Sequence, residues 1–279
     1  MLSRLTIMKY FTLFILLTLA SDLFSQTVEV PPDSLIKRNR IKTITSYFND
    51  ESTKDELSEV WKFDLDGKLI SRQLFDKEDT TLSMDLNFYK DNVLMETWNI
   101  GTWLKYDTVK TIYFYDGKKR VLKTITTGKF NPFNYNANGF KNTFLYLYVN
   151  DSVTLKKYEG DGLTARGSGT DSIIYNSDHT KKFLFNEGLN LKIIYKYNEQ
   201  KQLISETQTT ISNPNLIHHY NNYYYDNGQL IKEIIGHSVT GEKEKISEQE
   251  HFYINDNKGL ISKIQRQRTF DTYKYEYYK

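Results

Sequence analysis

The chain has 279 residues, of which 39% are hydrophobic and 26% charged, enough to bury a core in one or two domains. Its 37 basic residues nearly balance its 35 acidic ones, which argues against a nucleic-acid binder, because such proteins need clustered positive charge. The absence of cysteine excludes disulfide bonds, thiolate metal sites and cysteine nucleophiles.

The amino terminus predicts a targeting segment. Arg4 and Lys9 precede a mostly apolar stretch, residues 10–20, which ends near Asp22 and is shorter than the roughly 20 residues needed to cross a bilayer. We therefore expect residues 1–25 to be a cleavable signal peptide. The mature chain should be exported, periplasmic or extracellular, without a transmembrane span. With no cysteine to carry a lipid, it should not be a lipoprotein, and an exported chain without disulfides favours a bacterial source.

The rest of the chain divides into a short lead-in and one domain. Residues 26–40 predict a mobile lead-in, because Pro31 and Pro32 disfavour regular structure. No linker rich in Ser, Gly or Pro divides the remainder, so residues 41–279 predict a single repeat domain. Within it, residues 129–190 match the repeat poorly and are expected to be divergent units or an insertion.

One sequence motif recurs through this domain. It consists of a strand rich in aromatic residues, a turn of Asp, Asn or Gly, and a second strand that begins with leucine. It is clearest at residues 223–233 and returns around residues 63–70. Aligned on the first apolar residue after the turn, the copies follow one another at intervals of 25 to 30 residues, apart from one longer gap. The aligned residues are Leu69, Leu94, Leu122, Leu203, Leu230 and Leu260.

Each copy predicts a β-hairpin. Asp-Gly and Asn-Gly supply the positive φ angles of tight turns, and the flanking Tyr, Phe, Ile, Thr and Val favour strands. We therefore predict an all-β fold of stacked antiparallel β-hairpin repeats that form an extended sheet, as a single layer or curved. Residues 273–277 alternate Tyr with Lys or Glu and predict a final strand whose charges discourage pairing with a further chain.

These residues carry a family resemblance. Residues 225–230 and 115–118 resemble the tyrosine–aspartate (YD) repeat of RHS-type bacterial proteins, and the hairpin repeats of exported bacterial proteins described as MORN-like or antitoxin-like. The resemblance covers residues 60–279 irregularly. It implies stacked hairpins and an exported setting. It does not imply the toxin-enclosing shell of large RHS proteins, because the chain is too short and has no toxin-like domain.

No motif assigns a catalytic, cofactor-binding or metal-binding residue, and no cofactor is expected. The five histidines lack close metal-ligand spacing, and the chain has no nucleophile elbow and no phosphate-binding loop. Asp64 and Asp66 resemble the start of a calcium loop, but the later ligands do not follow at the required spacing. A turn is the simpler interpretation of these aspartates.

Aromatic residues give the one positive indication of a ligand site. They would form a flat platform for sugar rings or for a protein surface, although packing across strands is their commoner role. The candidate ligand-facing aromatics are Trp61, Trp98, Trp103, Tyr223 and Tyr225.

Three functions remain open. The leading hypothesis is an exported, non-enzymatic β-repeat protein that acts as an interaction or structural module at the bacterial cell envelope, with an envelope protein or a glycan as partner. The second is a glycan-binding accessory protein. The third is a hydrolase whose site the sequence does not reveal.

Overall fold

The computed structural model describes residues 33–50, 52, 55–78, 80–101, 108–130, 138–150, 152–160, 170–238 and 246–279. The expected signal peptide and the first part of the expected lead-in lie outside these residues. Within them the chain is almost entirely β-structure, as predicted, with one short helix, α2 (Asp33–Arg38). The strands are β1 (Ile41–Asn49), β2 (Glu56–Phe63), β3 (Leu69–Phe75), β4 (Thr81–Lys90), β5 (Val93–Gly101), β6 (Thr108–Tyr115), β7 (Val121–Phe130), β8 (Asn138–Asn150), β9 (Val153–Gly160), β10 (Thr170–Tyr175), β11 (Lys181–Asn186), β12 (Leu191–Tyr197), β13 (Leu203–Thr210), β14 (Ile217–Asp226), β15 (Gln229–Ser238), β16 (Ile246–Asn255), β17 (Ile261–Gln265) and β18 (Phe270–Tyr277).

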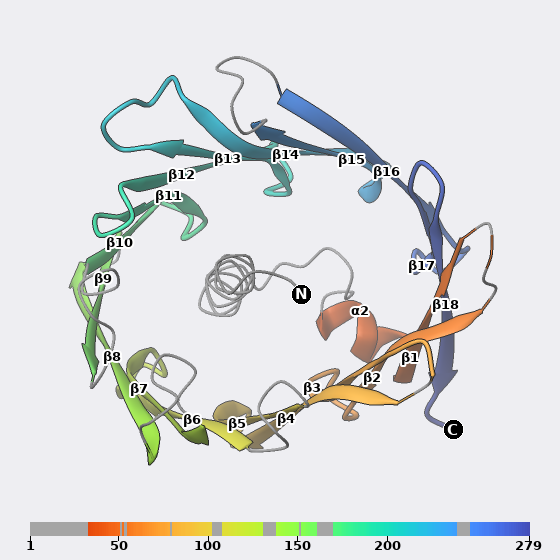
Figure 1. The fold of residues 1–279 in the computed structure, drawn as a ribbon, viewed down its shortest axis with the longest axis horizontal. Coiled ribbons are helices and arrows are strands. Elements are labelled where there is room, and N and C mark those ends of the chain that lie inside the picture. The colour runs from red at the N-terminus through yellow and green to blue at the C-terminus, as the bar shows by residue number, and fades with distance from the viewer. Residues whose placement is uncertain are drawn as a thin grey trace, which may run out of the picture.

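These strands form one closed barrel. Each strand pairs antiparallel with the next in sequence, from β1–β2 to β17–β18. β1 also pairs with β18, from Ile41↔Tyr277 to Asn49↔Phe270, and this pairing closes the 18-stranded sheet into a ring (Figure 1). The predicted extended sheet of stacked hairpin repeats is therefore wrong. The hairpins meander around a common axis, and closure leaves none of the 18 strands as an edge.

The carboxyl-terminal strand closes the barrel instead of forming a protected edge. Tyr273 and Tyr275 do share one face of β18, with Tyr273 only 8% exposed, while Lys274 and Glu276 lie exposed on the other. Those charges point out of the sheet and leave the backbone groups in its plane free to pair. β18 therefore pairs with both β17 and β1, and Tyr278 extends the contact through an Oη hydrogen bond of 2.5 Å to a carbonyl of β2.

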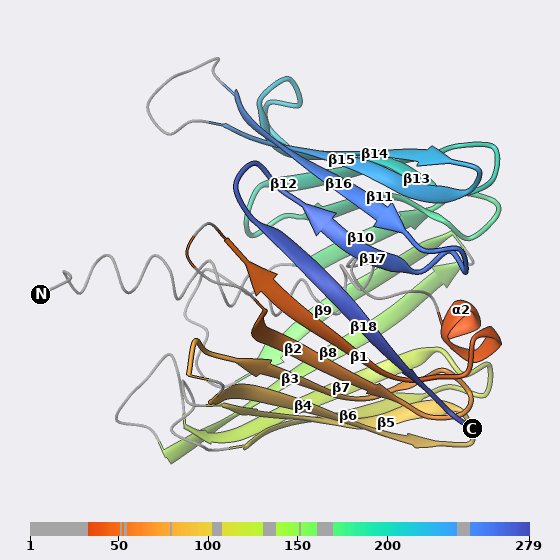
Figure 2. The same ribbon diagram turned by 90° about the vertical axis from the view of Figure 1, so that its right-hand side faces the viewer.

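The two ends of the barrel have different connections (Figure 2). At one end, which we call the turn end, short turns follow β2, β4, β6 and the other even-numbered strands, and α2 and the carboxyl terminus lie there too. The turn between β14 and β15 is Asn227-Gly228, with φ angles of 47° and 80°. Two successive positive φ angles make the tight turn that the Asn-Gly sequence predicts.

Five other turns at this end share a second geometry. Asp116 illustrates it, because its Oδ1 accepts hydrogen bonds from the backbone N–H of Lys118 and Arg120 at 2.8 and 2.9 Å. The positive φ, 60°, belongs to Lys119 and not to Gly117. In four of the five turns the Oδ1 atom of the first Asp or Asn accepts a backbone N–H from the fifth residue, and in the turn 176–180 Asp178 accepts from Thr180 instead, so an Asp or Asn side chain stabilises each turn. The five turns are residues 64–68, 116–120, 176–180, 198–202 and 256–260.

A tyrosine hydrogen bond explains why an aromatic residue recurs before the turn. Tyr225 Oη donates to the carbonyl of Leu203 at 3.0 Å, and Leu203 is the residue that follows the preceding turn. The bond therefore ties one hairpin to the hairpin before it. Equivalent bonds join Tyr89 to Leu69 at 3.2 Å, Tyr148 to Val121 at 2.8 Å, and Tyr115 to Leu94.

We expect Tyr225→Phe to lower the free energy of unfolding by about 1 kcal/mol, because the ring still packs while the Leu203 carbonyl loses its donor. Tyr224→Phe is the matched control. Tyr224 lies one residue away on the opposite face, 44% exposed, and its variant should stay within about 0.5 kcal/mol of the wild type. Urea denaturation measures both, and equal losses would show that the hydroxyl of Tyr225 does not link the hairpins.

Residues 33–38, part of the segment expected to be a mobile lead-in, form α2. Asp33 in the first turn and basic residues in the last suit the helix dipole. Ile36 is fully buried and packs in the core with Ile44 and Trp61. Figure 1 shows α2 inside the ring beside β1 and β2. The face that carries Ile44 and Trp61 is therefore the inner wall of the barrel.

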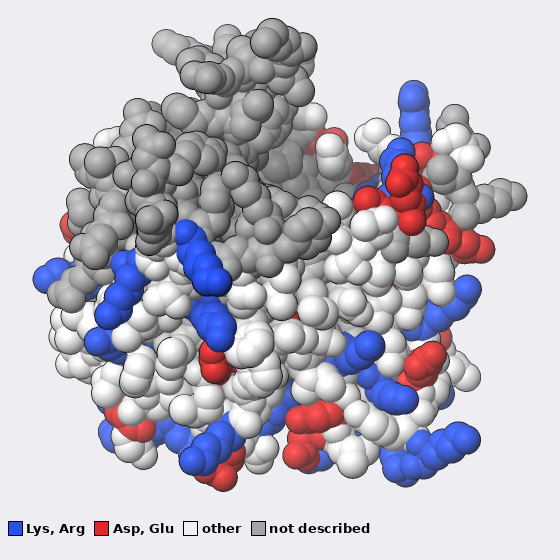
Figure 3. Space-filling model, turned by 60° about the horizontal axis from the view of Figure 1, so that its bottom comes forward, with Lys and Arg blue, Asp and Glu red and all other residues white. Residues whose placement is uncertain are grey.

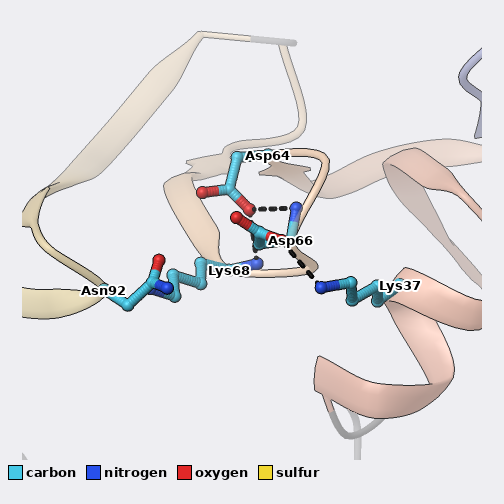
Figure 4. Close-up of polar contacts among 5 residues, drawn as sticks. All are labelled: Lys37, Asp64, Asp66, Lys68 and Asn92. Carbon is cyan, nitrogen blue, oxygen red and sulfur yellow. Dashed lines mark hydrogen bonds and ion pairs between the residues drawn. The ribbon is translucent and has the colours of Figure 1, made fainter.

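A turn of the barrel fixes α2 in place (Figure 4). Lys37 Nζ lies 2.8 Å from Asp66 Oδ1, and Asp64 Oδ1 accepts from the backbone N–H of Asp66 and Lys68, each at 2.9 Å. Lys68 Nζ reaches the next turn, 2.7 Å from Asn92 Oδ1. Helix and neighbouring turns thus form one polar network at the turn end.

Buried apolar side chains gather on the inner wall in two clusters. The larger surrounds α2 and the closing strands, and the smaller covers β10–β12. The larger contains Ile36, Ile41, Ile44, Trp61, Phe63, Tyr223, Leu230, Tyr253, Leu260, Ile261, Ile264 and Tyr273, and the smaller contains Ile173, Leu184, Ile193 and Tyr195.

Candidate functional site on the inner wall

Charged side chains share the inner wall with these apolar ones. Trp61, Arg72, Asp85 and Asn99 are partners in register on β2–β5. Glu59, two residues before Trp61 on the same face, holds Arg72 through two hydrogen bonds of 2.8 and 3.0 Å. Burial raises the pKa of Asp85, and its hydrogen bond from Asn99 opposes that shift. The charges here occur in hydrogen-bonded pairs, as buried charges require.

A second charged group lies on β9–β11. Lys156, only 4% exposed, is in register with Asp171, whose Oδ1 accepts a hydrogen bond of 2.6 Å from Asn186. Burial raises the pKa of Asp171, and the positive charge of Lys156 opposes that shift. The Lys156 ammonium also lies 4.3 Å from the centre of the Phe144 ring. A buried lysine is thus balanced by a carboxylate and an aromatic face.

A pocket of about 290 Å³ opens on the inner wall where β1 meets β18, and we call it the seam pocket. The rings of Trp61 and Tyr273 lie beside each other, with centroids 6.3 Å apart and planes inclined by 31°. Arg266 pairs with Asp271 at 2.5 Å, and the Asp271 residue is only 8% exposed. The lining residues are Ser46, Phe48, Ser58, Glu59, Trp61, Arg266, Thr269, Asp271 and Tyr273.

A third polar region crosses β11–β14. Tyr195, Glu206 and Asn221 are partners in register, so their side chains lie side by side. Tyr195 Oη and Asn221 Oδ1 are buried without a hydrogen-bond partner. Burial raises the pKa of Glu206 to about 7. The positive charge of Lys181 opposes this shift, and the negative charge of Glu233 adds to it. Burial also lowers the pKa of Lys181.

Histidines border this region on β14–β16. Tyr253 Oη donates to Glu233 at 2.9 Å, and His251 Nδ1 lies 3.5 Å from the same carboxylate. The Nδ1 atoms of His219 and His237 are 3.0 Å apart, and burial followed by the neighbouring ring lowers the pKa of His219. Among the residues that the structure describes, no group of three or more His, Asp or Glu side chains is arranged to hold a metal ion.

The outer wall also carries charge, here mixed with aromatic rings. Lys263 lies 3.9 Å from the centre of the Phe270 ring, and Lys232 pairs with Glu250 across β15 and β16 at 2.6 Å. In Figure 3, Lys and Arg are interspersed with Asp and Glu among uncharged residues. The outer wall of β4–β8 also exposes large apolar side chains, among them Phe88, Ile112, Phe114, Leu147 and Val149.

The candidate aromatics from the sequence do not share one surface. Trp61 lines the seam pocket, whereas Trp98 lies on the outer wall, 4.1 Å from the Lys110 ammonium. Tyr223 is buried in the core, 7% exposed, and Tyr225 is part of the tyrosine contact between hairpins. Trp103 lies outside the described residues. Of the five, Trp61 is the one in a described pocket.

The charged inner-wall residues were missed by motif reasoning. Glu59, Arg72, Glu206 and Asp271 belong to no motif, and their partners lie on other strands. One local signal was present: alternation places Glu59 on the same face as Trp61, so a buried tryptophan implies an inward-facing carboxylate. That signal requires the inner face to be known first.

No helix in the described part of the chain has the length and apolar character to cross a membrane. No family model matches the chain, and no curated protein matches it. A porin-like protein from Bacteroides uniformis is 10% identical over 85% of this chain and 97% of its own, with a TM-score of 0.34. The Tc holotoxin pore of Photorhabdus luminescens and the TcdB2–TccC3 structure are 11% and 10% identical, with TM-scores of 0.25 and 0.30. They match 76% and 80% of this chain but 16% of each of theirs, so the likeness to these two structures is weak.

Proposed function

We propose that this chain is an exported, non-enzymatic interaction module of the bacterial envelope, a closed barrel with water on its outer wall. The observation that carries the proposal is that charged side chains lie on the outer face of the barrel, at the middle of their strands. Lys157, Lys232, Glu250, Lys263 and Lys274 lie there, away from the ends of β9, β15, β16, β17 and β18.

A lipid-facing position would be costly for these residues. Lysine at the middle of a bilayer destabilises a membrane barrel by about 2–4 kcal/mol, whereas membrane barrels present an apolar band to lipid. Several such charges together would outweigh the marginal stability of a typical domain. The exposed apolar side chains of β4–β8 instead support an interaction surface on a protein in water.

The pocket chemistry supports a binding role over hydrolysis. A general acid or base needs a carboxyl group free to exchange a proton with substrate. In the seam pocket Glu59 is held by two hydrogen bonds from Arg72, and Asp271 by Arg266. Carboxylates engaged in this way orient a ligand more readily than they transfer its protons.

Cell fractionation tests the proposal. We expect the protein in the periplasmic or culture-medium fraction, beginning near Gln26, and released from membranes by alkaline carbonate. An outer-membrane barrel from the same cells serves as the control that remains in the pellet. Recovery of this chain with that control, or an amino terminus at Met1, would contradict the proposal.

A further inference from the structure

We propose that His219 and His237 together bind one divalent transition-metal ion, with Cu²⁺ preferred over Zn²⁺, through their Nδ1 atoms. The two residues are partners in register on β14 and β15. Alternation along β14 places His219 on the same face as Tyr223 of the core, so the pair lies on the inner wall. The inference goes beyond the proposed function and concerns a part of this wall separate from the seam pocket.

The geometry of the pair suits a metal whose ligands meet at right angles. The Nδ1 atoms are 3.0 Å apart, and the ring centroids are 4.6 Å apart with planes inclined by 45°. For metal–nitrogen distances of roughly 2.0–2.1 Å, this Nδ1 separation corresponds to an angle of about 90° at the metal. That angle is narrower than in tetrahedral zinc sites and matches the tetragonal sites of Cu²⁺. With two protein ligands, water completes the coordination.

The pair offers two lone pairs when both rings are neutral, the form in which imidazole binds metals. Burial, followed by the neighbouring ring, lowers the pKa of His219, which keeps this ring neutral to lower pH than an ordinary histidine. In the metal-free pair one Nδ1–H donates to the other Nδ1. Transfer of that proton to Nε2 of the same ring leaves both Nδ1 atoms available, with no net loss of a proton.

The surroundings of the pair favour a cation. His237 is exposed, so an ion can reach it from water. The register partners on the outer sides of the pair are Gln208 on β13 and Ser247 on β16, and both are uncharged. Besides His237, the charged group that acts on His219 is the carboxylate of Glu233. A negative charge at this distance attracts a metal ion and repels an anion.

Asn221 is placed to support a metal-bound His219. It lies two residues further along the same face of β14, and its Nδ2 donates to Tyr223 Oη at 3.1 Å. Its Oδ1 is buried without a hydrogen-bond partner, and Asn221 favours the protonated form of the His219 ring. A histidine that binds metal through one nitrogen usually donates the N–H of the other to an oxygen. With Nδ1 on the metal, Nε2–H of His219 would be the donor that Asn221 Oδ1 lacks.

The binding test uses the purified full chain without a histidine tag. Cu²⁺, Ni²⁺ and Zn²⁺ are titrated separately against a coloured chelator, and electron paramagnetic resonance counts the imidazole ligands of bound Cu²⁺. We expect one equivalent of Cu²⁺ at pH 7.5, with two imidazoles in a tetragonal spectrum, bound at least about tenfold more tightly than Zn²⁺. At pH 5.5 protons compete for both Nδ1 atoms and should weaken binding at least about tenfold. Absence of stoichiometric Cu²⁺ binding, or tighter binding of Zn²⁺, would overturn the proposal.

Variants locate the site. His219→Gln and His237→Gln should each weaken Cu²⁺ binding at least about tenfold and remove one imidazole from the spectrum. The double variant should lose little more than either single one, because both nitrogens hold the same ion. His179→Asn is the control. It removes a histidine from the turn between β10 and β11, where asparagine tolerates the positive φ of 66°, and should leave binding unchanged.

Circular dichroism checks the fold of each variant, and the exposed position of His237 makes its variant the safer of the two. Unchanged binding in a folded His237→Gln variant, or an equal loss in His179→Asn, would overturn the proposal. These outcomes are separate from the fate of the proposed function, because the titrations use purified protein and report on the histidine pair whatever the cellular fraction.

Discussion

Gly67→Ala should lower the free energy of unfolding by about 3 kcal/mol or more. Gly67 has a φ of 83°, which costs an L-residue roughly 1–2 kcal/mol. A Cβ there would also lie 2.4 Å from the carbonyl oxygen of Asp33 and 3.0 Å from the backbone nitrogen of Lys37. Both atoms belong to the backbone of α2, so no side chain can turn aside. The helix must move away from the core that Ile36 completes.

Substitutions at two other glycines separate the cost of a positive φ angle from the cost of a steric clash of the added Cβ. Gly228 has nearly the same φ, 80°, but nothing lies within 4 Å of its Cβ position, so Gly228→Ala should cost only about 1–2 kcal/mol. Gly117 has open space and no positive φ, and Gly117→Ala should be nearly neutral. Chemical denaturation should rank the losses Gly67, Gly228, Gly117. Equal losses at Gly67 and Gly228 would show that α2 does not pack on the turn.

Glu206→Gln should stabilise the protein at pH 8 by a few kcal/mol and have much less effect near pH 4.5. Burial raises the folded-state pKa of Glu206 to about 7, above its usual 4.5. Between these pH values the unfolded state releases a proton that the folded state retains. Stability therefore falls as pH rises through this window, by on the order of 3 kcal/mol at 1.36 kcal/mol per pKa unit. Glutamine carries no proton to release and avoids the loss.

Urea denaturation of wild type and variant at pH 5, 6, 7 and 8 measures the effect as a difference, in which the other titrations cancel. Glu250→Gln is the matched control on the outer wall, where its partner Lys232 is also accessible to water. Its difference from wild type should stay below about 1 kcal/mol. Glu206→Gln removes the negative charge next to Lys181, which would offset part of the expected stabilisation. The double variant Glu206→Gln with Lys181→Met measures the size of that offset. A Glu206→Gln difference that is equal at pH 5 and pH 8 would contradict the inward, dehydrated position of Glu206.

The local elements of this fold could be predicted from the sequence because their signals are local. Asn227-Gly228 predicts a tight turn by its backbone preferences. A tyrosine recurs before several of the turns, and in Tyr89, Tyr115, Tyr148 and Tyr225 its hydroxyl binds the previous hairpin. Closure could not be predicted. β1 and β18 meet through backbone groups that every sequence has, and nothing near Ile44 indicates that its partner is Tyr275.

Of the residues that line the seam pocket, one was a candidate from the sequence. Trp61 was a candidate as an aromatic side chain and does line a pocket, but Glu59, Arg266 and Asp271 become neighbours only when the barrel closes. Trp98 shows the limit of residue type as a guide. The same tryptophan chemistry appears on the outer wall, where a lysine covers the ring. Alternation along a strand separates two faces, but only the closed ring decides which face is the inner one.

The pairing of β1 with β18 determines the order in which the barrel can form during synthesis of the chain. Every other strand pairing joins neighbours in sequence and can form as the chain emerges. Arg40, in contrast, bonds to the carbonyl of Lys279, 239 residues later. Until residues 270–277 have been made, β1 keeps an unpaired backbone edge, and the most recently formed strand presents another. An incomplete chain is therefore an open sheet with two unpaired edge strands. Neighbouring incomplete chains would compete with the chain's own β18 for pairing with β1.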